Sequence, residues 1–478
     1  MNKKFIIAGA ILGLLLVIYF GFVIFFSSHY LWNTTVGSVE CGGKSSDYVV
    51  EANKSLADNY NLNITDREGT VFTINGKDIS YKYVPNGEEE NILKSQNAFS
   101  WPISIFKSHK YELSASVDYD ADIFSGIFDS MALFSSDYIE DPENAKIEIN
   151  ETDYKVVNEI NGNKPIRDEI YNEVTEALNN QFEEITLGKK CYVEPEVKAD
   201  DDIIKNATTA IDNYTSANIH YLIDGVDENL SSEKILQMLT ISDDFTVSIN
   251  EEKVAEYVQY LATTYNTYGD TRAFHTSSGD VVNIGGGDYG WVISKSKEKA
   301  QILTDLQNGS PVEREPVYEQ TARKSGTDDI GNTYIEIDYG RQHLWFYKEG
   351  SLVVESDIVS GNISQQNGSV DGIFKIVYKE KDATLVGENY ASNVKYFMPF
   401  AYNIGIHDAS WRDKFGGDIY KTSGSHGCIN VPESVAVTIF ENVEVGTPVV
   451  AYYREPVTLT NNAAAQSNAY SYVKPEQP

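Results

Sequence analysis

The sequence is organised around one stretch, Ser425-His426-Gly427-Cys428-Ile429-Asn430, with a second histidine, His407, 21 residues ahead of the cysteine. A cysteine with two histidines nearby is typical of a catalytic thiol, because an imidazole can take the proton of the sulfur at neutral pH. The glycine directly before the cysteine lets a substrate approach the backbone and leaves N–H groups free for an oxyanion. We therefore interpret Cys428 as a nucleophile.

The identity of the general base is left open by the residues alone. His407 is followed directly by Asp408, which can orient the imidazole through its side chain or through its backbone carbonyl. His426 lies two residues before Cys428, so it could instead polarise the thiol or shape the pocket for the oxyanion. Spacing does not rank the two histidines.

Two other interpretations of the cysteine compete with this one. Cys428 could be a buried structural thiol. It could also join His407, His426 and Asp408 in a zinc site, since all four side chains are chemically suitable ligands. The zinc interpretation is weak because Asp408, as the sequence neighbour of His407, would rarely reach the same ion. We expect no metal and no cofactor.

The chain is long and strongly acidic. Its 478 residues exceed what one hydrophobic core organises, so several domains are expected. The formal net charge is -33, and most of the acidic excess precedes the C-terminal domain. Such a surface repels phosphate backbones, which argues against nucleic acid as a partner.

The N-terminus predicts a membrane anchor. No charged residue occurs from Phe5 to Phe26, and these 22 residues reach about 33 Å at helical rise, enough to cross a bilayer core. Lys3 and Lys4 precede the span, which places residues 1–4 in the cytoplasm and the chain after residue 27 outside. The alternative is a cleaved signal peptide, although its apolar region is usually shorter. We predict a single-pass protein of the cell membrane.

Two further cysteines precede the candidate nucleophile. Cys41 and Cys191 could form a disulfide outside the cytoplasm, which would leave Cys428 as the odd thiol. Spacing does not show their distance in space, so two free thiols are an equal alternative.

Changes of composition predict the remaining boundaries. In two α+β units the order strand, helix, strand recurs, with residues 193–197 and 312–317 as the closing strands, which suggests a degenerate repeat. Strand patterns then dominate, with one helix expected over residues 433–442. After the membrane helix at 5–26, the predicted segments are a polar stalk at 27–45, α+β domains at 46–200 and 201–318, a linker at 319–330, a mostly β domain at 331–455 and a disordered tail at 456–478.

The cysteine motif resembles that of a known family. His407, then 17 residues, then Ser-His-Gly-Cys-apolar-Asn is similar to the signature of the L,D-transpeptidases, whose catalytic domain is called YkuD-type. The flanks at 396–400 and 405–409 and the first hairpin at 342–347 are also similar. More loosely, the upstream region resembles the peptidoglycan-binding domains that precede such catalytic units. The resemblance implies a mostly β catalytic domain.

The resemblance also implies an activity. Cys428 would attack the L,D-peptide bond before the terminal D-alanine of a tetrapeptide stem, and the amine of a neighbouring stem would resolve the acyl-enzyme into a 3→3 cross-link. Carbapenems would acylate the same sulfur. The roles that it implies are general base for His407, orienter for Asp408, oxyanion contacts for His426, Gly427 and Cys428, and motif positions for Ser425 and Asn430.

Two rival functions use the same residues differently. An L,D-carboxypeptidase would form the same acyl-enzyme and use water as the acceptor, and nothing in the residues separates the two reactions. A non-catalytic wall-binding protein is less supported, because the motif is intact. The expected partners are stem peptides, the membrane through the N-terminal helix and, as a hypothesis, wall glycan stacked on upstream aromatics such as Trp101 and Trp291.

Overall fold

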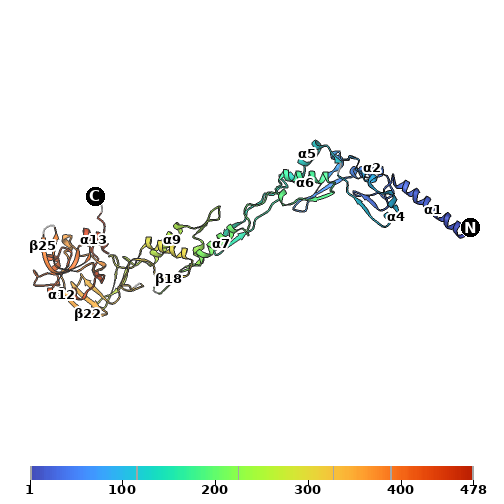
Figure 1. The fold of residues 1–478 in the computed structure, drawn as a ribbon. Coiled ribbons are helices and arrows are strands. Elements are labelled where there is room, and N and C mark those ends of the chain that lie inside the picture. The colour runs from blue at the N-terminus through green and yellow to red at the C-terminus, as the bar shows by residue number, and fades with distance from the viewer. Residues whose placement is uncertain (1–2, 115–116, 224, 327, 388–389, 476–478) are drawn as a thin grey trace. The chain divides into compact units, whose positions relative to one another are not determined.

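The computed structural model describes residues 3–114, 117–223, 225–326, 328–387 and 390–475. The chain forms two compact units: Met1–Glu148 with Lys155–Ile204, and Ile149–Tyr154 with Lys205–Pro478. Helices and small sheets make up the N-terminal part, and the C-terminal part is rich in strands (Figure 1). The predicted multidomain fold class is confirmed.

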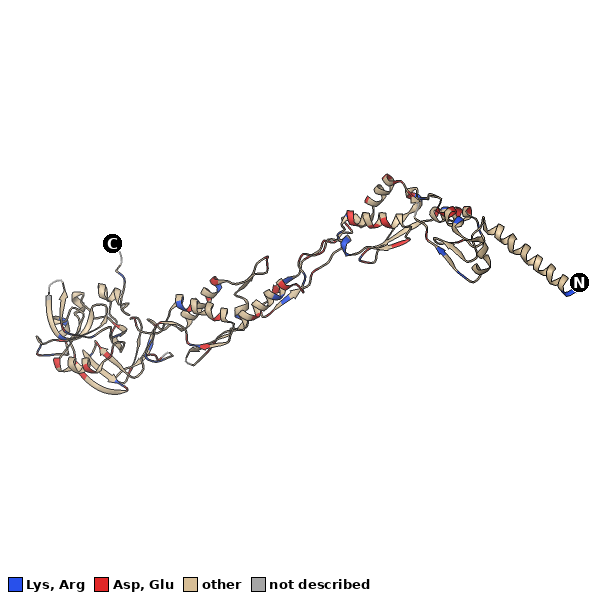
Figure 2. Cartoon of the chain, viewed as in Figure 1, with Lys and Arg blue, Asp and Glu red and all other residues tan. Residues whose placement is uncertain are grey.

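The first element is a long apolar helix, α1 (Lys3–Phe26). It is long and apolar enough to cross a membrane, and it carries no charge beyond Lys4 (Figure 2). Its last residue, Phe26, is fully buried against the folded chain that follows. The C-terminal end of α1 is therefore packed against the rest of the first unit.

The predicted stalk at 27–45 is wrong, because this segment is folded. Strand β1 (Thr34–Val36) pairs in parallel with β6 (His109–Tyr111) and antiparallel with β2 (Val39–Glu40). Tyr30 and Val36 are fully buried in one cluster with residues of α2 (Ser46–Asp58). The prediction failed because most side chains of this segment are polar. Its few apolar side chains are spaced apart in the sequence, and they are the ones that pack into the core.

The two α+β parts of the chain have the same topology. In the first, the order of elements is α2, β3 (Asn61–Thr65), β4 (Val71–Asn75), α6 (Arg167–Asn179) and β10 (Glu184–Thr186). In the second, it is α7 (Asp202–Thr215), β11 (Ile219–Ile223), β12 (Val226–Leu230), α10 (Lys295–Asn308) and β18 (Val312–Arg314). Each has a hairpin whose first strand pairs in parallel with the last strand, in sheets ordered β10-β3-β4 and β18-β11-β12. We call these parts the first and second repeat.

The closing strand of the first repeat is not where the sequence placed it. Residues 193–197 contain no strand, and β10 occupies the position of β18. The other elements between Gly76 and Gln320 are η1 (Gly76–Ile79), β5 (Lys82–Tyr83), α3 (Glu88–Ser95), η2 (Ala98–Ser100), α4 (Trp101–Ser104), β7 (Val117–Asp118), α5 (Ala121–Asp129), η3 (Ala132–Phe134), β8 (Lys146–Ile149), β9 (Tyr154–Val157), η4 (Lys189–Cys191), α8 (Ser232–Leu236), β13 (Leu239–Ile241), β14 (Val247–Ile249), α9 (Glu251–Tyr265), β15 (Arg272–His275), β16 (Val281–Ile284), β17 (Val292–Ile293) and β19 (Tyr318–Gln320).

The C-terminal domain contains two sheets. The five-stranded sheet has the order β22-β21-β20-β28-β23, and the four-stranded sheet has the order β24-β25-β26-β27. Their elements are β20 (Tyr334–Asp338), β21 (His343–Lys348), β22 (Ser351–Asp357), η5 (Ile363–Gln365), β23 (Gly372–Lys375), β24 (Glu380–Gly387), β25 (Tyr390–Ala401), β26 (Ile404–Asp408), α11 (Ile419–Ser423), β27 (Ile429–Val431), α12 (Glu433–Asn442), β28 (Pro448–Tyr452) and α13 (Asn462–Gln466).

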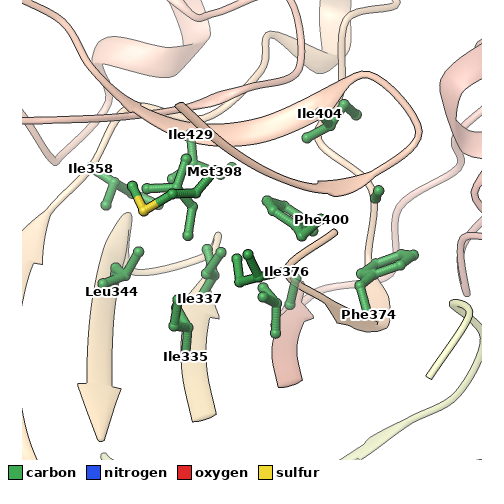
Figure 3. Packing of buried hydrophobic residues seen from close by; sticks show 14 of the residues in the cluster. Ile335, Ile337, Leu344, Ile358, Phe374, Ile376, Met398, Phe400, Ile404 and Ile429 are labelled. Atoms are coloured by element: carbon green, nitrogen blue, oxygen red, sulfur yellow. The ribbon is translucent and has the colours of Figure 1, made fainter. Parts of the chain in front are cut away.

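Side chains from both sheets meet in one buried core. Figure 3 shows Ile335 and Ile337 of β20 together with Met398 and Phe400 of β25 in this cluster. Ile429, the residue after the candidate nucleophile, is fully buried in it too. Burial of an isoleucine side chain contributes about 1.5–3 kcal/mol, so the core fixes the strand that carries the cysteine motif.

The other face of β20 carries acids that meet the second repeat. Because side chains alternate along a strand, Glu336 and Asp338 point away from the isoleucines. Both are fully buried. Glu336 accepts hydrogen bonds from the N–H and the hydroxyl of Ser277, and Asp338 accepts one from Arg454 Nε at 2.6 Å. The C-terminal domain is thus hydrogen-bonded to the second repeat.

The predicted disordered tail at 456–478 is wrong for the described residues up to 475. Leu459, Ala464 and Ala469 belong to the hydrophobic core of the C-terminal domain, and the backbone N–H of Tyr470 donates to the carbonyl of Asp371 at 2.7 Å. The Asn- and Ala-rich composition suggested disorder, but small apolar side chains at these positions bury well against a preformed surface.

Candidate active site

Two neighbouring strands bring the motif residues together. β26 and β27 pair in parallel, and their register sets His407 opposite Asn430 and Ile406 opposite Ile429. His407, Asp408 and Asn430 are all nearly fully buried. The chain crosses between these strands through α11, so the 21-residue spacing of histidine and cysteine is the length of one crossover.

A chain of hydrogen bonds fixes the protonation of His407. The Arg412 guanidinium donates from Nε to Asn430 Oδ1 at 2.8 Å, and Arg412 Nη1 donates to the carbonyl of Ser423. Because arginine only donates, the amide of Asn430 must present its NH₂ group to His407, where Nδ2 lies 3.1 Å from Nε2. Nε2 therefore accepts, and the ring proton sits on Nδ1.

The Nδ1 proton has its own acceptor. Nδ1 lies 2.8 Å from the backbone carbonyl of Asp408. The Asp408 carboxylate is used elsewhere, because its Oδ1 accepts the backbone N–H groups of Lys395 and Tyr396, each at 2.8 Å. Of the two groups of Asp408 that could orient the imidazole of His407, the backbone carbonyl does so and the carboxylate does not. Burial lowers the pKa of His407, so its imidazole is neutral at neutral pH.

The loop before Cys428 is held by serine side chains. Ser425 Oγ accepts the N–H of Gly427 at 3.1 Å and donates to the carbonyl of Cys428. Ser369 Oγ donates to the carbonyl of Gly427 at 2.6 Å and accepts the N–H of Gly361 at 2.9 Å. Gly427 has a φ of 121°, a conformation that favours glycine.

The sulfur of Cys428 borders an open hollow. This hollow has a volume of about 240 Å³, and Cys428 Sγ lies 3.7 Å from the carbonyl of Asn403. Burial raises the pKa of Cys428 to about 11, so the thiol is protonated at rest. The residues that line the hollow are Leu385, Ser392, His407, Trp411, Arg412, Gly424, Ser425, His426, Cys428 and Asn430.

The structure thus brings most predicted site residues to one place. His407, His426, Cys428, Ser425 and Asn430 line the same hollow, with His426 exposed at its edge. Gly427 lies in the loop just behind it, and Asp408 acts on the site from behind His407 through its backbone.

The sequence analysis did not predict the contacts that Arg412 makes with Asn430 and that Ser369 makes with the carbonyl of Gly427. Arg412 was visible only as a cation close to His407 in sequence. Ser369 gives no sequence signal, because it lies 58 residues from the carbonyl that it holds. Asn430 was expected only as a motif position, and the structure places its amide nitrogen 3.1 Å from His407 Nε2.

The zinc interpretation has no support in the donor geometry. Both nitrogens of His407 already have hydrogen-bond partners. Among the residues that the structure describes, no group of three His, Cys, Asp or Glu side chains could hold a metal ion. The possible disulfide is also settled: Cys41 and Cys191 are free thiols, each buried in a different cluster.

Family models match two parts of the chain. Residues 332–450 match the L,D-transpeptidase catalytic domain, YkuD, and residues 203–313 match a candidate peptidoglycan-binding domain. A comparison with curated proteins found no match.

Solved structures extend the comparison. The chain is 35% identical to a cysteine-to-serine mutant of the Enterococcus faecium L,D-transpeptidase, covering 52% of this chain and 100% of that one, with a TM-score of 0.45. An Ldtfm–avibactam carbamoyl enzyme is 36% identical over 52% of this chain and 98% of that one, with a TM-score of 0.45. The E. faecium catalytic domain acylated by ertapenem is 47% identical over 25% of this chain and 97% of that one, with a TM-score of 0.24.

The strand-rich domain with its buried histidine and cysteine loop is a YkuD-type catalytic domain, so the protein is a peptidoglycan-modifying enzyme. Its 35% identity to the enterococcal enzyme extends over the whole of the chain in that solved structure. The chain therefore belongs to the L,D-transpeptidase family.

Proposed function

We propose that the protein is a membrane-anchored transpeptidase whose Cys428 cleaves the L,D bond before the terminal D-alanine of a tetrapeptide stem and passes the acyl group to a neighbouring stem amine, forming 3→3 cross-links. The observation that carries this proposal is the fixed hydrogen-bond chain from Arg412 through Asn430 and His407 to the carbonyl of Asp408. It holds a neutral base at the hollow that contains the sulfur.

Before the reaction, the thiol of Cys428 and the imidazole of His407 are both uncharged. The thiol therefore loses its proton as it attacks the substrate. As Cys428 Sγ bonds to the substrate carbonyl carbon, its proton passes to His407 Nε2. The amide of Asn430 has to withdraw from Nε2 at this point, since two donors cannot face each other. The imidazolium then gives the proton to the leaving amine of D-alanine, which leaves a thioester on Cys428.

The oxyanion contact follows from the orientation of one peptide bond. In a planar trans peptide the carbonyl and the following N–H point in opposite directions. Ser369 holds the Gly427 carbonyl on its own side, so the N–H of Cys428 points away from Ser369. The N–H of Gly427 is bonded to Ser425. We assign the main oxyanion contact to the amide of Cys428, with His426 at the edge of the hollow as the second candidate.

The second half of the reaction decides between a transpeptidase and a carboxypeptidase. Both use the same thioester, and the acceptor is either a stem amine or water. The test is incubation of the protein with a disaccharide-tetrapeptide and mass analysis of the products. Cross-linked dimer supports the proposal, whereas tripeptide alone identifies a carboxypeptidase.

Contacts at the C-terminal end of α1 support the proposal that this helix is an uncleaved membrane anchor. Gln96 Nε2 donates to the carbonyls of Phe26 and His29, and Phe26 is fully buried. A cleaved signal peptide would remove one side of these contacts. Lys3 and Lys4 before the span favour an N-terminus inside the cell and a catalytic domain outside, at the cell wall. An intact N-terminal peptide in the membrane fraction is the expected result, and a mature chain that begins near residue 27 would contradict it.

The repeats are the wall-binding part of this proposal. The second repeat coincides with the matched peptidoglycan-binding domain at 203–313, and the first repeat has the same topology. We assign both, as domains 46–200 and 201–318, to peptidoglycan binding ahead of the catalytic domain that begins near residue 331. Loss of sacculus binding on deletion of residues 46–318 is the expected result, and unchanged binding would overturn it.

A further inference from the structure

The two repeats each contain a hollow at the same place in their topology. In the first repeat it lies just past the ends of β3 and β10 and has a volume of about 500 Å³. In the second it lies at the ends of β11 and β18 and has a volume of about 420 Å³. Both strand pairs are parallel, and open α/β sheets bind ligands outside the carboxyl ends of parallel strands. The fold therefore leaves a ligand-sized space at a favourable position in each repeat.

The hollow of the second repeat has an aromatic wall that is held rigidly. The ring centroids of Trp291 and Tyr318 are 4.6 Å apart, with an interplanar angle of 53°. Trp291 Nε1 donates to the carbonyl of Lys324 at 2.9 Å, and its backbone N–H donates to Thr267 Oγ1 at 2.8 Å. Tyr265, which also lines the hollow, donates to the buried carboxylate of Glu228.

The polar groups of this hollow select its ligand class. Among the described residues that line it, Glu315 carries the only charge, and Thr264 and Ser325 contribute hydroxyls. A lone carboxylate disfavours the free carboxylates of stem peptides and suits a donor such as a sugar hydroxyl. An aromatic wall suits the C–H face of a pyranose ring.

The corresponding hollow of the first repeat is different. The Arg67 guanidinium lies 4.2 Å from the centre of the Tyr192 ring and pairs with Glu194, and Lys189 and Lys198 also line the space. A charged lining of both signs does not offer the same apolar wall. The two positions are equivalent, but only the second has the chemistry of a sugar site.

We propose that the hollow of the second repeat binds the glycan strand of peptidoglycan, with one sugar ring against Trp291 and Tyr318 and a sugar hydroxyl bonded to Glu315. This proposal rests on the function proposed above and adds the part of the substrate that is recognised and the residues that recognise it. The catalytic domain handles the stem peptide, and the second repeat holds the strand that carries it.

The test measures binding of the detergent-solubilised full-length protein to glycan strands whose stem peptides an amidase has removed. Trp291→Ala should weaken binding by roughly tenfold or more, as removal of an aromatic anchor does. Trp291→Phe should restore most of the affinity, because a ring remains. Tyr268→Ala, an exposed aromatic of the same domain outside the hollow, is the matched control and should bind like the wild type.

Equal binding of the peptide-free glycan strands by Trp291→Ala and the wild type would overturn the site. The control for the catalytic proposal is the cross-linking assay on the unmodified protein. If the wild type makes no dimer but its glycan binding still depends on Trp291, the transpeptidase proposal fails and the glycan site stands. If the wild type makes dimer and glycan binding does not depend on Trp291, the transpeptidase proposal stands and the glycan site fails.

An independent feature is an apolar segment beside the N-terminal helix. Phe99, Ile103, Ile105 and Phe106 are 57%, 64%, 47% and 89% exposed. They belong to η2, α4 and the turn that follows α4. Such a group of large exposed apolar side chains marks an interaction surface.

This segment is docked against the outer end of α1. Tyr19 Oη donates to the carbonyl of Phe99 at 2.9 Å, and Trp101 Nε1 donates to the carbonyl of Tyr19 at 3.2 Å. The rings of Trp101 and Phe22 have centroids 4.6 Å apart. The segment is thus level with the last two turns of α1.

The length of the helix places these turns within the bilayer. A hydrocarbon core of about 30 Å needs about 20 helical residues. Residues 5–18 supply only about 21 Å, so the core has to extend over the turns that carry Tyr19 and Phe22. We infer that residues 99–106 enter the outer leaflet beside α1, with the exposed Lys107 and Lys110 at the lipid headgroups.

The test places a fluorophore at the most exposed of these side chains. Phe106→Cys in a Cys428→Ser background is labelled with an environment-sensitive dye, since Cys41 and Cys191 are fully buried. The protein is placed in nanodiscs of phosphatidylcholine and phosphatidylglycerol with nitroxide-labelled lipid. Val71→Cys, 55% exposed on β4, is the matched control. Several-fold stronger quenching at position 106 is the expected result, and equal quenching at both positions would overturn the inference.

Discussion

The substitution Asn430→Asp tests the hydrogen-bond chain at the base most sharply. The wild-type amide donates to His407 Nε2, which keeps that nitrogen unprotonated and ready to accept the proton of the thiol. A carboxylate in its place cannot donate. It would still accept from Arg412, but it would demand a proton on Nε2 as well as the one that Nδ1 shares with the Asp408 carbonyl. The substitution therefore favours the imidazolium.

The size of the effect follows from the distances. A unit charge 3.1 Å from Nε2 is worth about 5 kcal/mol at an effective dielectric constant of 20. The new carboxylate would share part of its charge with the Arg412 guanidinium to which it is hydrogen-bonded, and water in the open hollow screens the rest, so the pKa of His407 rises by less than this Coulomb energy. We expect a net rise of about one to two units in the pKa of His407, or about 1.4–2.7 kcal/mol.

The assay is the rate of Cys428 acylation by a carbapenem as a function of pH. In the wild type, burial lowers the pKa of His407, so the rate should hold its neutral value until the pH drops below about 6.5. In Asn430→Asp the fall in rate should begin at a pH about one to two units higher than in the wild type. Asn430→Ala is the control: it should be slower at every pH, without the shift. An acidic limb that stays in place in Asn430→Asp would refute the contact between residue 430 and Nε2 of His407.

Other substitutions probe separate parts of the structure. His407→Ala should slow acylation by about a hundredfold or more, because it removes the base; a larger loss in His426→Ala would reverse the two roles. Gly427→Ala should cost about 1–3 kcal/mol of strain at a φ of 121° and push against Ile404 at 3.2 Å, with loss of acylation measured by mass. Asp329→Ala should lower the free energy of unfolding by about 3–5 kcal/mol in a denaturant titration, because it leaves the buried Arg272 guanidinium, 2.7 Å away, without its counter-charge; a change under about 1 kcal/mol would contradict this.

The parts of the fold that the sequence predicted are those whose signals are local. The apolar run that forms α1 and the alternation at 334–338 are read within a single element. The histidine and cysteine spacing is also local, because one crossover joins the two strands. These features do not depend on partners elsewhere in the chain.

The parts that sequence reasoning missed depend on distant partners. β10 is only three residues long, and its strand character comes from pairing with β3, more than a hundred residues earlier. The folded segment at 27–45 and the packed C-terminus at 456–475 bury against surfaces that composition does not reveal. The roles of Ser369 and Asn430 likewise appear only when separate strands meet.

The most direct measurement is the intact mass of the purified protein after exposure to a carbapenem, followed by peptide mapping. The expected result is one covalent adduct per chain on the peptide that contains Cys428, with none in Cys428→Ser. An unmodified wild-type protein, or an adduct that persists in Cys428→Ser, would contradict the assignment of this sulfur as the nucleophile.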